Sequence, residues 1–211
     1  MTELTLVRHG ETIWHAEHRY AGSSDIPLTP RGRLQAQELA ECLAHTGLDA
    51  IHTSPLIRAR DTAEAVGRAA GLTVHTDARL TELDFGAAEG LTGAEMTERF
   101  DTARQDFVRD PVTHHLPGGE DPRRAVRRMT ACLTELTAQH PDGRVLVVGH
   151  GTIQRLVLCH LLGLPLQNYR RHFPTVRNCG LSTVRWDGTD EPSTVALIEY
   201  NIPTGSAGTG P

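Results

Sequence analysis

Two short stretches of the chain end an apolar run in a histidine followed by a glycine. The stretch "LTLVRHG" (4–10) places Arg8 and His9 directly after apolar residues, and "VLVVGHG" (145–151) places His150 in the same way. Apolar runs of this length are typical of buried strands in a parallel sheet, where ligands bind beyond the carboxyl ends. If the two strands are neighbours, His9 and His150 face one pocket.

Arg58 and Glu82 would complete a phosphate site with these residues. Arg58 follows "TSP" (53–55), which predicts a helix start, and a helix N-terminus favours an anion. Two arginines, two imidazoles and a helix end suit a phosphoryl group better than a carboxylate, because each of its three equatorial oxygens can take a charged donor. A neutral imidazole can attack phosphorus when a backbone carbonyl, here near Gly10, fixes its tautomer. Glu82, in "LTELDFG", is the best candidate for a carboxylic acid with a raised pKa that protonates the leaving oxygen.

Each of these signals has a plainer explanation when it is taken alone. A histidine at the end of a strand is more often structural than catalytic. Arg58 could form an ion pair with Asp61, and Glu82 could cap a turn. A function therefore follows only if all of these residues occur together and in order.

The composition limits what else the chain can be. Its 211 residues, 38% of them hydrophobic, suffice for one globular domain, and a net charge of −5 provides no general basic field for nucleic acid or an anionic membrane. No run approaches about 18 apolar residues, and the N-terminus predicts a strand instead of a signal segment. The four cysteines lack CxxC spacing, so we expect the buried, reduced thiols of a cytoplasmic protein at Cys42, Cys132, Cys159 and Cys179.

Strand-like and helix-like segments alternate along the chain. Such alternation with short loops implies an α/β sandwich over a largely parallel sheet. We expect an antiparallel edge from two late runs joined by turn residues, an insertion over one end of the sheet, and a disordered tail. The expected strands are 4–7, 49–54, 72–76, 144–150, 181–186 and 193–200, the expected helices are 29–47, 54–71, 121–139 and 152–163, the insertion is 92–120 and the tail is 204–211.

Capping residues mark the ends of the expected helices. Thr29 and Ser54 are each followed by a proline, which suits an N-cap before the first helical residue. Gly47 and Gly71 are expected to end the same two helices. A Thr92-x-x-Glu95 capping box opens a further helix after the irregular stretch 78–93.

Six sequence blocks occur in an order that is highly specific. They are "LVRHGET" (6–12), "AGSSDIPLTPRGRLQA" (21–36), "TSPLIRARDTA" (53–63), "LTELDFGAAEG" (80–90), "LPGGE" (116–120) and "VLVVGHG" (145–151). With these blocks the chain resembles the histidine phosphatase superfamily, in its phosphoglycerate mutase-like family. The resemblance implies a three-layer α/β/α sandwich with a mainly parallel six-stranded sheet, one antiparallel edge and a small helical insertion over the active site, in one domain of residues 1–203.

The resemblance also implies roles for individual residues. His9 resembles the phosphorylated nucleophile and Glu82 the proton donor, while Arg8, Arg58 and His150 resemble the rest of the catalytic phosphate pocket. The family chemistry needs no metal and no cofactor. The expected substrate-binding residues are Arg8, His15, Ser23, Arg58, Glu82, His150 and Gly151.

Three positions depart from the family pattern. His15 stands where members usually carry an asparagine that also touches the phosphate. The imidazole could donate one hydrogen bond there, or it could stack beside Trp14 outside the site. Ala88 replaces a frequent tryptophan, which we interpret as a packing change near Glu82, and Asp121 replaces a serine while remaining a competent helix cap.

The expected activity is that of a phosphatase for small phosphorylated metabolites. The segment 83–149 is short for a mutase, which must shield its phosphohistidine, so water could reach the site. Mutase-type transfer and a non-catalytic phosphate-binding protein are the alternatives left open. A metal enzyme has little support, because the 12 histidines, including the pair His114-His115, show no HExxH spacing.

The expected partner is a small phosphomonoester, with no nucleic acid and no membrane. Sugar phosphates, phosphoglycerate-like acids, nucleotides and cofactor precursors all remain candidates, because family analogy cannot choose among them. A homodimer is left open. Arg104, Arg109, His114 and His115 are expected either to line the insertion near the leaving group or to be solvated surface.

Overall fold

A six-stranded sheet forms the centre of the molecule. The computed structural model describes residues 1–189 and 191–205. The sheet has the order β3-β2-β4-β1-β5-β6, in which the first four strands are parallel and β5 pairs antiparallel with both of its neighbours. The expected sheet with its antiparallel edge is confirmed. The strands are β1 (Thr2–Arg8), β2 (Ala50–Thr53), β3 (Val74–Thr76), β4 (Arg144–Gly149), β5 (Leu181–Trp186) and β6 (Ala196–Ile202).

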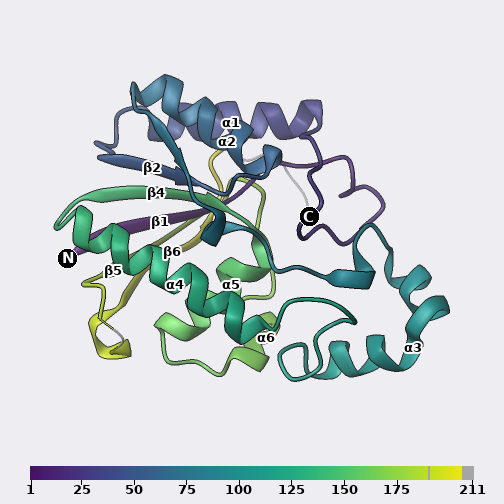
Figure 1. Cartoon of the computed structure of the whole chain (residues 1–211). Helices are drawn as coiled ribbons and strands as arrows, with labels where there is room; N and C mark the ends of the chain where they lie inside the picture. Colours follow the sequence, from purple (N-terminus) through teal and green to yellow (C-terminus); the bar gives the residue numbers. More distant parts are fainter. Residues whose placement is uncertain (190, 206–211) are drawn as a thin grey trace.

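Helices cover both faces of the sheet and give the three expected layers (Figure 1). Helices α1 (Pro30–Leu43) and α2 (Ile57–Ala70) pack on one face. Helices α4 (Pro122–Gln139) and α5 (Gly151–Leu161) pack on the other. The insertion helix α3 (Gly93–Arg109) lies apart from the sheet, and the short α6 (Tyr169–His172) follows α5.

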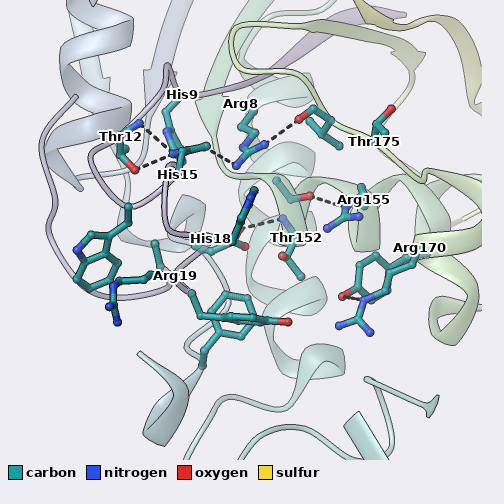
Figure 2. A pocket seen from close by; sticks show the side chains of 18 of the residues that line it. Arg8, His9, Thr12, His15, His18, Arg19, Thr152, Arg155, Arg170 and Thr175 are labelled. Carbon is teal, nitrogen blue, oxygen red and sulfur yellow. Dashed lines mark hydrogen bonds between the residues drawn. The ribbon is translucent and has the colours of Figure 1, made fainter. Parts of the chain in front are cut away.

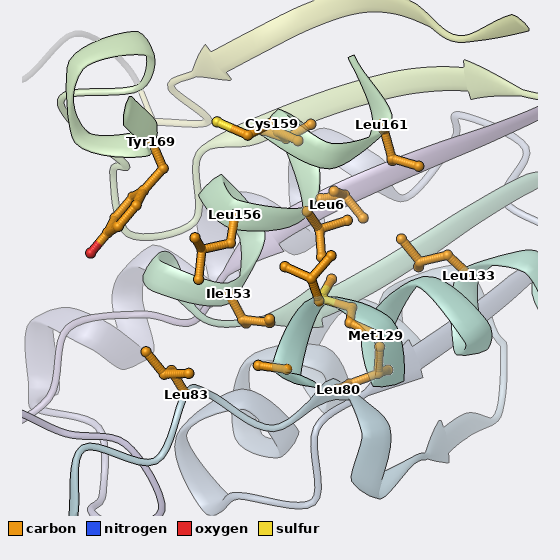
Figure 3. Packing of buried hydrophobic residues seen from close by; sticks show 14 of the residues in the cluster. Leu6, Leu80, Leu83, Met129, Leu133, Ile153, Leu156, Cys159, Leu161 and Tyr169 are labelled. Atoms are coloured by element: carbon orange, nitrogen blue, oxygen red, sulfur yellow. The ribbon is translucent and has the colours of Figure 1, made fainter. Parts of the chain in front are cut away.

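Side chains of the central strands alternate between two cores. Leu6 of β1 packs with residues of α4 and α5, such as Leu133 and Ile153 (Figure 3). The next residue, Val7, belongs to the core under α1 and α2. Because both faces are covered, the strands read as continuous apolar runs. The same burial fixes the register of β1 and β4, and therefore the positions of the residues that follow them.

Helix α1 begins as predicted but ends earlier. Thr29 caps it by accepting a hydrogen bond from the Gly32 N–H at 2.9 Å. The last helical residue is Leu43, so the prediction that Gly47 ends the helix was wrong. Ala44 is the C-cap residue, and the carbonyl of Leu43 accepts hydrogen bonds from the N–H and the hydroxyl of Thr46, at 3.2 and 2.9 Å.

Helix α2 is capped by a residue that is distant in the sequence. The helix begins at Ile57, and Leu56, not Ser54, occupies the N-cap position, which corrects the prediction. Asp25, in the loop before α1, accepts a hydrogen bond from the Ile57 N–H at 2.6 Å. Gly71 ends the helix in the left-handed region with φ of 70°, as predicted.

The capping residues around the insertion are confirmed. Thr92 and Glu95 form both hydrogen bonds of the capping box at the start of α3. Asp121 caps α4 by accepting a hydrogen bond from the Arg123 N–H at 2.8 Å. The replacement of serine by Asp121 therefore preserves the cap.

The two late strands form the expected hairpin, but both ends of the second strand are shifted, from the expected 193–200 to Ala196–Ile202. Strand β5 covers 181–186 as predicted, and it pairs antiparallel with β6. Strand β6 begins at Ala196 instead of residue 193, because Pro192–Thr194 form a 3-10 turn. Within the described part of the chain, no helix is both long enough and apolar enough to span a membrane.

The cysteines are free thiols, and one of them departs from expectation. Cys42 is exposed on α1, whereas the other three are buried as predicted. Buried Cys179 also anchors the end of the described chain, since its carbonyl accepts a hydrogen bond from the Thr204 hydroxyl at 3.2 Å. Residues 206–211 of the expected disordered tail lie outside the described residues.

Candidate active site

The parallel pairing of β1 and β4 brings His9 and His150 together. Arg8 lies opposite Gly149 in the register, and the His9 N–H continues the pairing by donating to the Gly149 carbonyl at 3.0 Å. The two histidines therefore leave the sheet at the same level, with ring centroids 5.3 Å apart. Both are buried, at 5% and 1% exposure. The geometric expectation from the two His-Gly stretches is confirmed.

His9 keeps one ring nitrogen free. Its Nδ1 lies 2.7 Å from the carbonyl oxygen of Gly10. Because a carbonyl can only accept, Nδ1 carries the proton and Nε2 keeps its lone pair. Burial, together with His150, Arg58 and Arg8, holds the pKa of His9 well below its usual range. The imidazole is therefore neutral near pH 7 and able to act as a nucleophile.

Close packing, and not an unusual backbone angle, requires glycine at position 10. A Cβ on Gly10 would collide with the carbonyl oxygen of Gly32 in the first turn of α1. The Gly10 N–H donates to the Thr62 hydroxyl on α2 at 3.1 Å. The loop that carries His9 is thus fixed against both helices of this face.

Gly151 leaves room for Arg8. The Nη1 of Arg8 donates to the Val176 carbonyl at 2.8 Å, which extends the side chain past the start of α5. A Cβ on Gly151 would lie 3.3 Å from both Cδ and Nε of Arg8. Burial lowers the pKa of Arg8 to about 10, so the guanidinium remains charged at pH 7. A glycine at position 151 therefore leaves room for the side chain of Arg8, which passes over it.

Arg58 is fully buried and is held by backbone carbonyls. Its Nη1 donates to the Ser24 carbonyl at 2.6 Å and its Nη2 to the Gly22 carbonyl at 2.7 Å. Its charge contributes to the lowered pKa of both His9 and His150. The side chain is therefore close to both imidazoles, although it does not reach the cavity surface.

Glu89 holds the loop that holds Arg58, and sequence reasoning missed it. Its carboxylate accepts hydrogen bonds from the backbone N–H groups of Gly22, Ser23 and Ser24, at 2.9 to 3.2 Å. Ser23, an expected substrate-binding residue, is itself exposed and lies outside the cavity lining. Glu89 belongs to the block "LTELDFGAAEG", but its partners lie far away in the sequence, so no local pattern indicates the contact.

Several buried polar atoms beside His9 have no hydrogen-bond partner among the described residues. They are Nε of Arg8, Nε of Arg58 and both ring nitrogens of His150. Burial and the charges of the nearby arginines hold the pKa of His150 well below its usual range, so its neutral ring has one N–H to donate. Buried polar groups are normally paired. This group of donors therefore suits a ligand with several acceptor oxygens.

Glu82 accepts three backbone hydrogen bonds. They come from the N–H groups of Leu83, Thr152 and Ile153, each at 2.8 Å. Thr152 and Ile153 lie in the first turn of α5, so the carboxylate sits at a helix N-terminus. Arg128 fixes the segment by donating to the Glu82 carbonyl at 2.9 Å. The Glu82 carboxylate is the acceptor in all three hydrogen bonds. To act as an acid, as expected, Glu82 must first gain a proton.

His15 lies in the cavity lining beside Arg8 (Figure 2). The N–H and the hydroxyl of Thr12 lie 3.0 and 2.8 Å from its Nδ1, while Nη2 of Arg8 and Nδ2 of Asn178 lie 2.8 and 3.3 Å from its Nε2. A neutral imidazole has one acceptor nitrogen, yet donors approach both. The Arg8 guanidinium can only donate, so Nε2 is the acceptor and the proton lies on Nδ1, where the Thr12 hydroxyl at 2.8 Å can accept it.

These residues surround one cavity of about 540 Å³, a size that suits a small metabolite. Of the residues expected from the sequence, its lining contains Arg8, His9, His15, Glu82 and Gly151. His150 and Arg58 are buried without reaching its surface. Figure 2 shows the cluster of His9, His15 and Arg8 on one side and two further arginines, Arg155 and Arg170, on the other.

The insertion does not line this cavity. Arg109 pairs with Asp106 at 2.6 Å, and His114 and His115 are exposed. Arg104 likewise lies outside the lining. None of these four residues therefore lines the cavity as expected; Arg109, His114 and His115 are surface residues, and Arg104 is half-buried. The insertion helix α3 contributes indirectly through Phe107, whose ring packs 4.6 Å from the Arg170 guanidinium carbon.

The polar groups of the cavity suit an anion. The basic residues in its lining include four arginines, and Glu82 is the acidic residue. Within residues 1–189 and 191–205, no group of three or more His, Cys, Asp or Glu side chains is arranged to hold a metal ion. A further positioning residue that sequence reasoning missed is Asn178, which donates to the His9 carbonyl at 2.8 Å.

Known proteins are similar to this chain in sequence and in fold. The family model described as "Histidine phosphatase superfamily (branch 1)" matches residues 4–197. A probable phosphoglycerate mutase GpmB of Citrobacter koseri is 38% identical over 184 residues, which cover 87% of this chain and 85% of that protein. The structure of a mycobacterial glucosyl-3-phosphoglycerate phosphatase aligns with a TM-score of 0.85 at 30% identity, over 95% of this chain and 98% of that chain. The alpha-ribazole phosphatase from Shigella flexneri aligns with a TM-score of 0.82 at 27% identity, over 94% and 96%. The chain therefore belongs to the histidine phosphatase superfamily.

Proposed function

We propose that the protein is a phosphomonoesterase that hydrolyses small phosphorylated metabolites without a metal, through a phosphohistidine at His9. The observation that carries this function is the buried, neutral His9, whose Nδ1–H is fixed by the Gly10 carbonyl. Its free Nε2 lies among donors of Arg8, Arg58 and His150 that have no partner within the described chain. A nucleophile surrounded by unpartnered donors suits phosphoryl transfer.

The first step transfers the phosphoryl group to His9. Nε2 attacks phosphorus, the N–P bond forms, and the bond from phosphorus to the leaving oxygen breaks. Arg8 and Arg58 offset the negative charge of the equatorial oxygens, and His150 donates its single N–H to the same group. Glu82 gives a proton to the leaving alkoxide.

The second step releases inorganic phosphate. Glu82, now a carboxylate, takes a proton from a water molecule as the water oxygen attacks phosphorus. The N–P bond breaks, and its electron pair returns to Nε2 of His9. Neutral His9 and protonated Glu82 are thereby restored for the next substrate.

The open rim of the cavity supports hydrolysis. The exposed side chains of His18, Pro174 and Thr175 line it, so water has access to a phosphohistidine. The helix α3 adds no side chain to the lining that would shield the intermediate. Transfer between phosphoglycerates is the second candidate, because the relative that is 38% identical is named a probable phosphoglycerate mutase.

The hydrolysis of an aryl phosphate tests the mechanism. We expect release of phosphate that excess chelator does not change, and a loss of at least about 10³-fold in kcat for His9→Gln. Arg58→Gln should lose activity, whereas the matched control Arg60→Gln, an exposed arginine on the same helix, should not. A labelled substrate should leave a phosphoenzyme that is stable in base and labile in acid. An activity that depends on a divalent ion would contradict the phosphohistidine mechanism.

A second assay separates the two transfer reactions. Phosphoglycerates are incubated with the enzyme, and both positional exchange and free phosphate are measured. Hydrolysis predicts that phosphate release outpaces exchange, and a mutase predicts the reverse. A binding protein would produce neither product and no phosphoenzyme.

The proposal also concerns a partner and a compartment. The partner is a small phosphomonoester, supported by a cavity of about 540 Å³ with a cationic lining. We place the reaction in the cytoplasm, because the cysteines are free thiols, as is usual in a reducing compartment.

A further inference from the structure

Two arginines line the cavity without an ionic partner. Arg155 lies on α5 and Arg170 on α6, and both side chains are half-buried. Within the described ranges, neither forms a salt bridge. Arg19, from the same lining, is by contrast paired with Glu17 and Glu95, each at 2.8 Å. Arg155 and Arg170 therefore present uncompensated charge to the cavity.

Neutral groups hold the two guanidinium groups in place. The ring of Tyr169 lies 4.9 Å from the guanidinium carbon of Arg155 and 5.3 Å from that of Arg170. The Nε of Arg155 donates to the Gly151 carbonyl, and Nε of Arg170 donates to the Tyr169 hydroxyl, both at 3.0 Å. The ring of Phe107 also packs against Arg170, 4.6 Å from its guanidinium carbon. Aromatic faces and carbonyls orient the charges without neutralising them.

Each guanidinium group keeps donors available for a ligand. The Nη2 of Arg155 and the Nη2 of Arg170 make no hydrogen bond to the residues that the structure describes. The Nη1 atoms make only long contacts of 3.4 and 3.5 Å to carbonyl oxygens. Arginine binds planar or tetrahedral anions through such paired N–H groups.

The cavity holds more positive charge than one phosphate offsets. A phosphomonoester dianion at His9 would offset the charges of Arg8 and Arg58, which leaves Arg155 and Arg170. The acidic residue of the lining, Glu82, is already bound by three backbone N–H groups. Besides burial, the like charges of Arg155 and Arg58 lower the pKa of Arg8, which indicates that these cations repel one another.

We propose that Arg155 and Arg170 form a second anion subsite, which binds a carboxylate or second phosphate of the substrate whose phosphoryl group lies at His9. The subsite rests on the proposed function, because it places the reacting phosphate at His9. The substrate class is then a phosphomonoester with a further anionic group on a short spacer, small enough for about 540 Å³.

A series of matched substrates tests the subsite. The carboxylates are phosphonooxy acids with two, three or four carbons, and each is compared with its methyl ester, which keeps the phosphate and removes the second charge. Bisphosphates of the corresponding diols replace the carboxylate by phosphate. We expect the wild-type enzyme to favour the doubly anionic substrate over its ester at least tenfold in kcat/KM at the best spacer length. The difference should lie in KM.

Single substitutions assign the preference to the two arginines. Arg155→Gln and Arg170→Gln should each reduce the ratio of kcat/KM between acid and ester at least fivefold, and Arg155→Lys should restore part of it. The matched control is Arg171→Gln, an exposed arginine next to Arg170 and outside the cavity lining. This control should keep the wild-type ratio. Whichever second group, carboxylate or phosphate, gives the larger preference in kcat/KM is the anion that the subsite binds.

The outcomes separate the subsite from the hydrolytic function. Equal kcat/KM for acids and esters in the wild-type enzyme would overturn the subsite while the phosphatase stands. An equal loss of preference in Arg171→Gln would also overturn it, since the effect would be one of general surface charge. If no substrate is hydrolysed, the proposed function fails. In that case the affinities of the acid and of its ester for the same variants are measured by calorimetry, which tests the subsite independently of hydrolysis. Equal affinities would reject the subsite.

Discussion

The Nε2 of His15 lies 2.8 Å from the Nη2 of Arg8, while the Thr12 hydroxyl lies 2.8 Å from the other nitrogen of the same ring. The lowered pKa of His15, about 4, has burial as its largest cause and the charge of Arg8 as its second. The ring is therefore neutral across the physiological range. Its Nε2 accepts a hydrogen bond from Arg8, a role that the amide oxygen of an asparagine at this position could also take.

His15→Asn should thus keep most of the activity at pH 7. Between about pH 5 and 8 its profile of kcat/KM should follow that of the wild type, because the imidazole does not titrate there. His15→Ala should lose about 10- to 100-fold, since a hydrogen bond to a charged group contributes about 1.5–3 kcal/mol. Steady-state kinetics across pH provide the measurement. A wild-type profile with a step that disappears in His15→Asn would contradict a neutral His15.

The neutral histidines also predict how stability depends on pH. The pKa values of His9, His15 and His150 are all lowered in the folded state. As pH falls below about 6.5, the unfolded chain takes up protons that the folded protein does not, so the free energy of unfolding falls. Each such histidine contributes about 1.4 kcal/mol per pH unit well below 6.5. For His15 this loss continues until pH reaches about 4.

Urea unfolding at pH 7.5 and 5.5 measures this dependence. We expect a lower free energy of unfolding at pH 5.5. His15→Asn should lose less stability between the two values than the wild type, because one titrating imidazole is absent from its unfolded state. An identical or larger loss in this variant would show that His15 takes up its proton in the folded protein.

Glu89 should control the phosphate site without touching the substrate. Glu89→Gln weakens the N–H bonds that hold residues 22–24, and the carbonyls of this loop orient Arg58. Displacement of Arg58 by about 1 Å would cost on the order of 10²-fold in kcat/KM. Inhibition by inorganic phosphate should weaken as well, a readout that a loss of stability alone would not change. Glu41→Gln, an exposed glutamate on α1, serves as the control. Unchanged phosphate inhibition in Glu89→Gln would refute this role.

Gly151→Ala should raise the stability of the protein and lower its activity. Gly151 is the first residue of α5 and has no positive φ, so alanine suits its backbone and should raise the free energy of unfolding by about 0.4–1 kcal/mol. The new Cβ would lie 3.3 Å from Cδ and Nε of Arg8, which must shift. We expect a higher Tm together with at least a tenfold lower kcat/KM. If both quantities stay at wild-type values, Arg8 has more freedom than its contacts indicate.

Features that follow from strand pairing and local chain signals could be predicted from the sequence. His9 and His150 each follow a buried apolar run, and two such strands paired in parallel must place these histidines at the same edge of the sheet. The caps at Thr29, Thr92 and Asp121 were equally local, since each bonds to a backbone N–H within three residues.

Contacts between distant segments could not be predicted. Asp25 caps α2 although Ser54 carries the local signal, because the loop before α1 folds over the helix start. The same loop meets Arg58 through the Ser24 carbonyl, a backbone atom, while the Ser23 side chain remains exposed. Backbone carbonyls have no signature in the residue type. Glu89 binds backbone N–H groups of this loop, which likewise have no signature in the residue type, so this contact was missed as well.

The buried Arg58 is held by carbonyls, which fix a guanidinium group without cancelling its charge. An arriving dianion therefore displaces no internal carboxylate from Arg58. The inorganic phosphate left after hydrolysis interacts with the same uncancelled charge of Arg58 as the substrate did, because it differs from the substrate only by the lost leaving group. We expect product departure to limit turnover, with a burst of alcohol before the steady state and marked inhibition by phosphate. The same charge that binds the substrate therefore slows the release of the phosphate product.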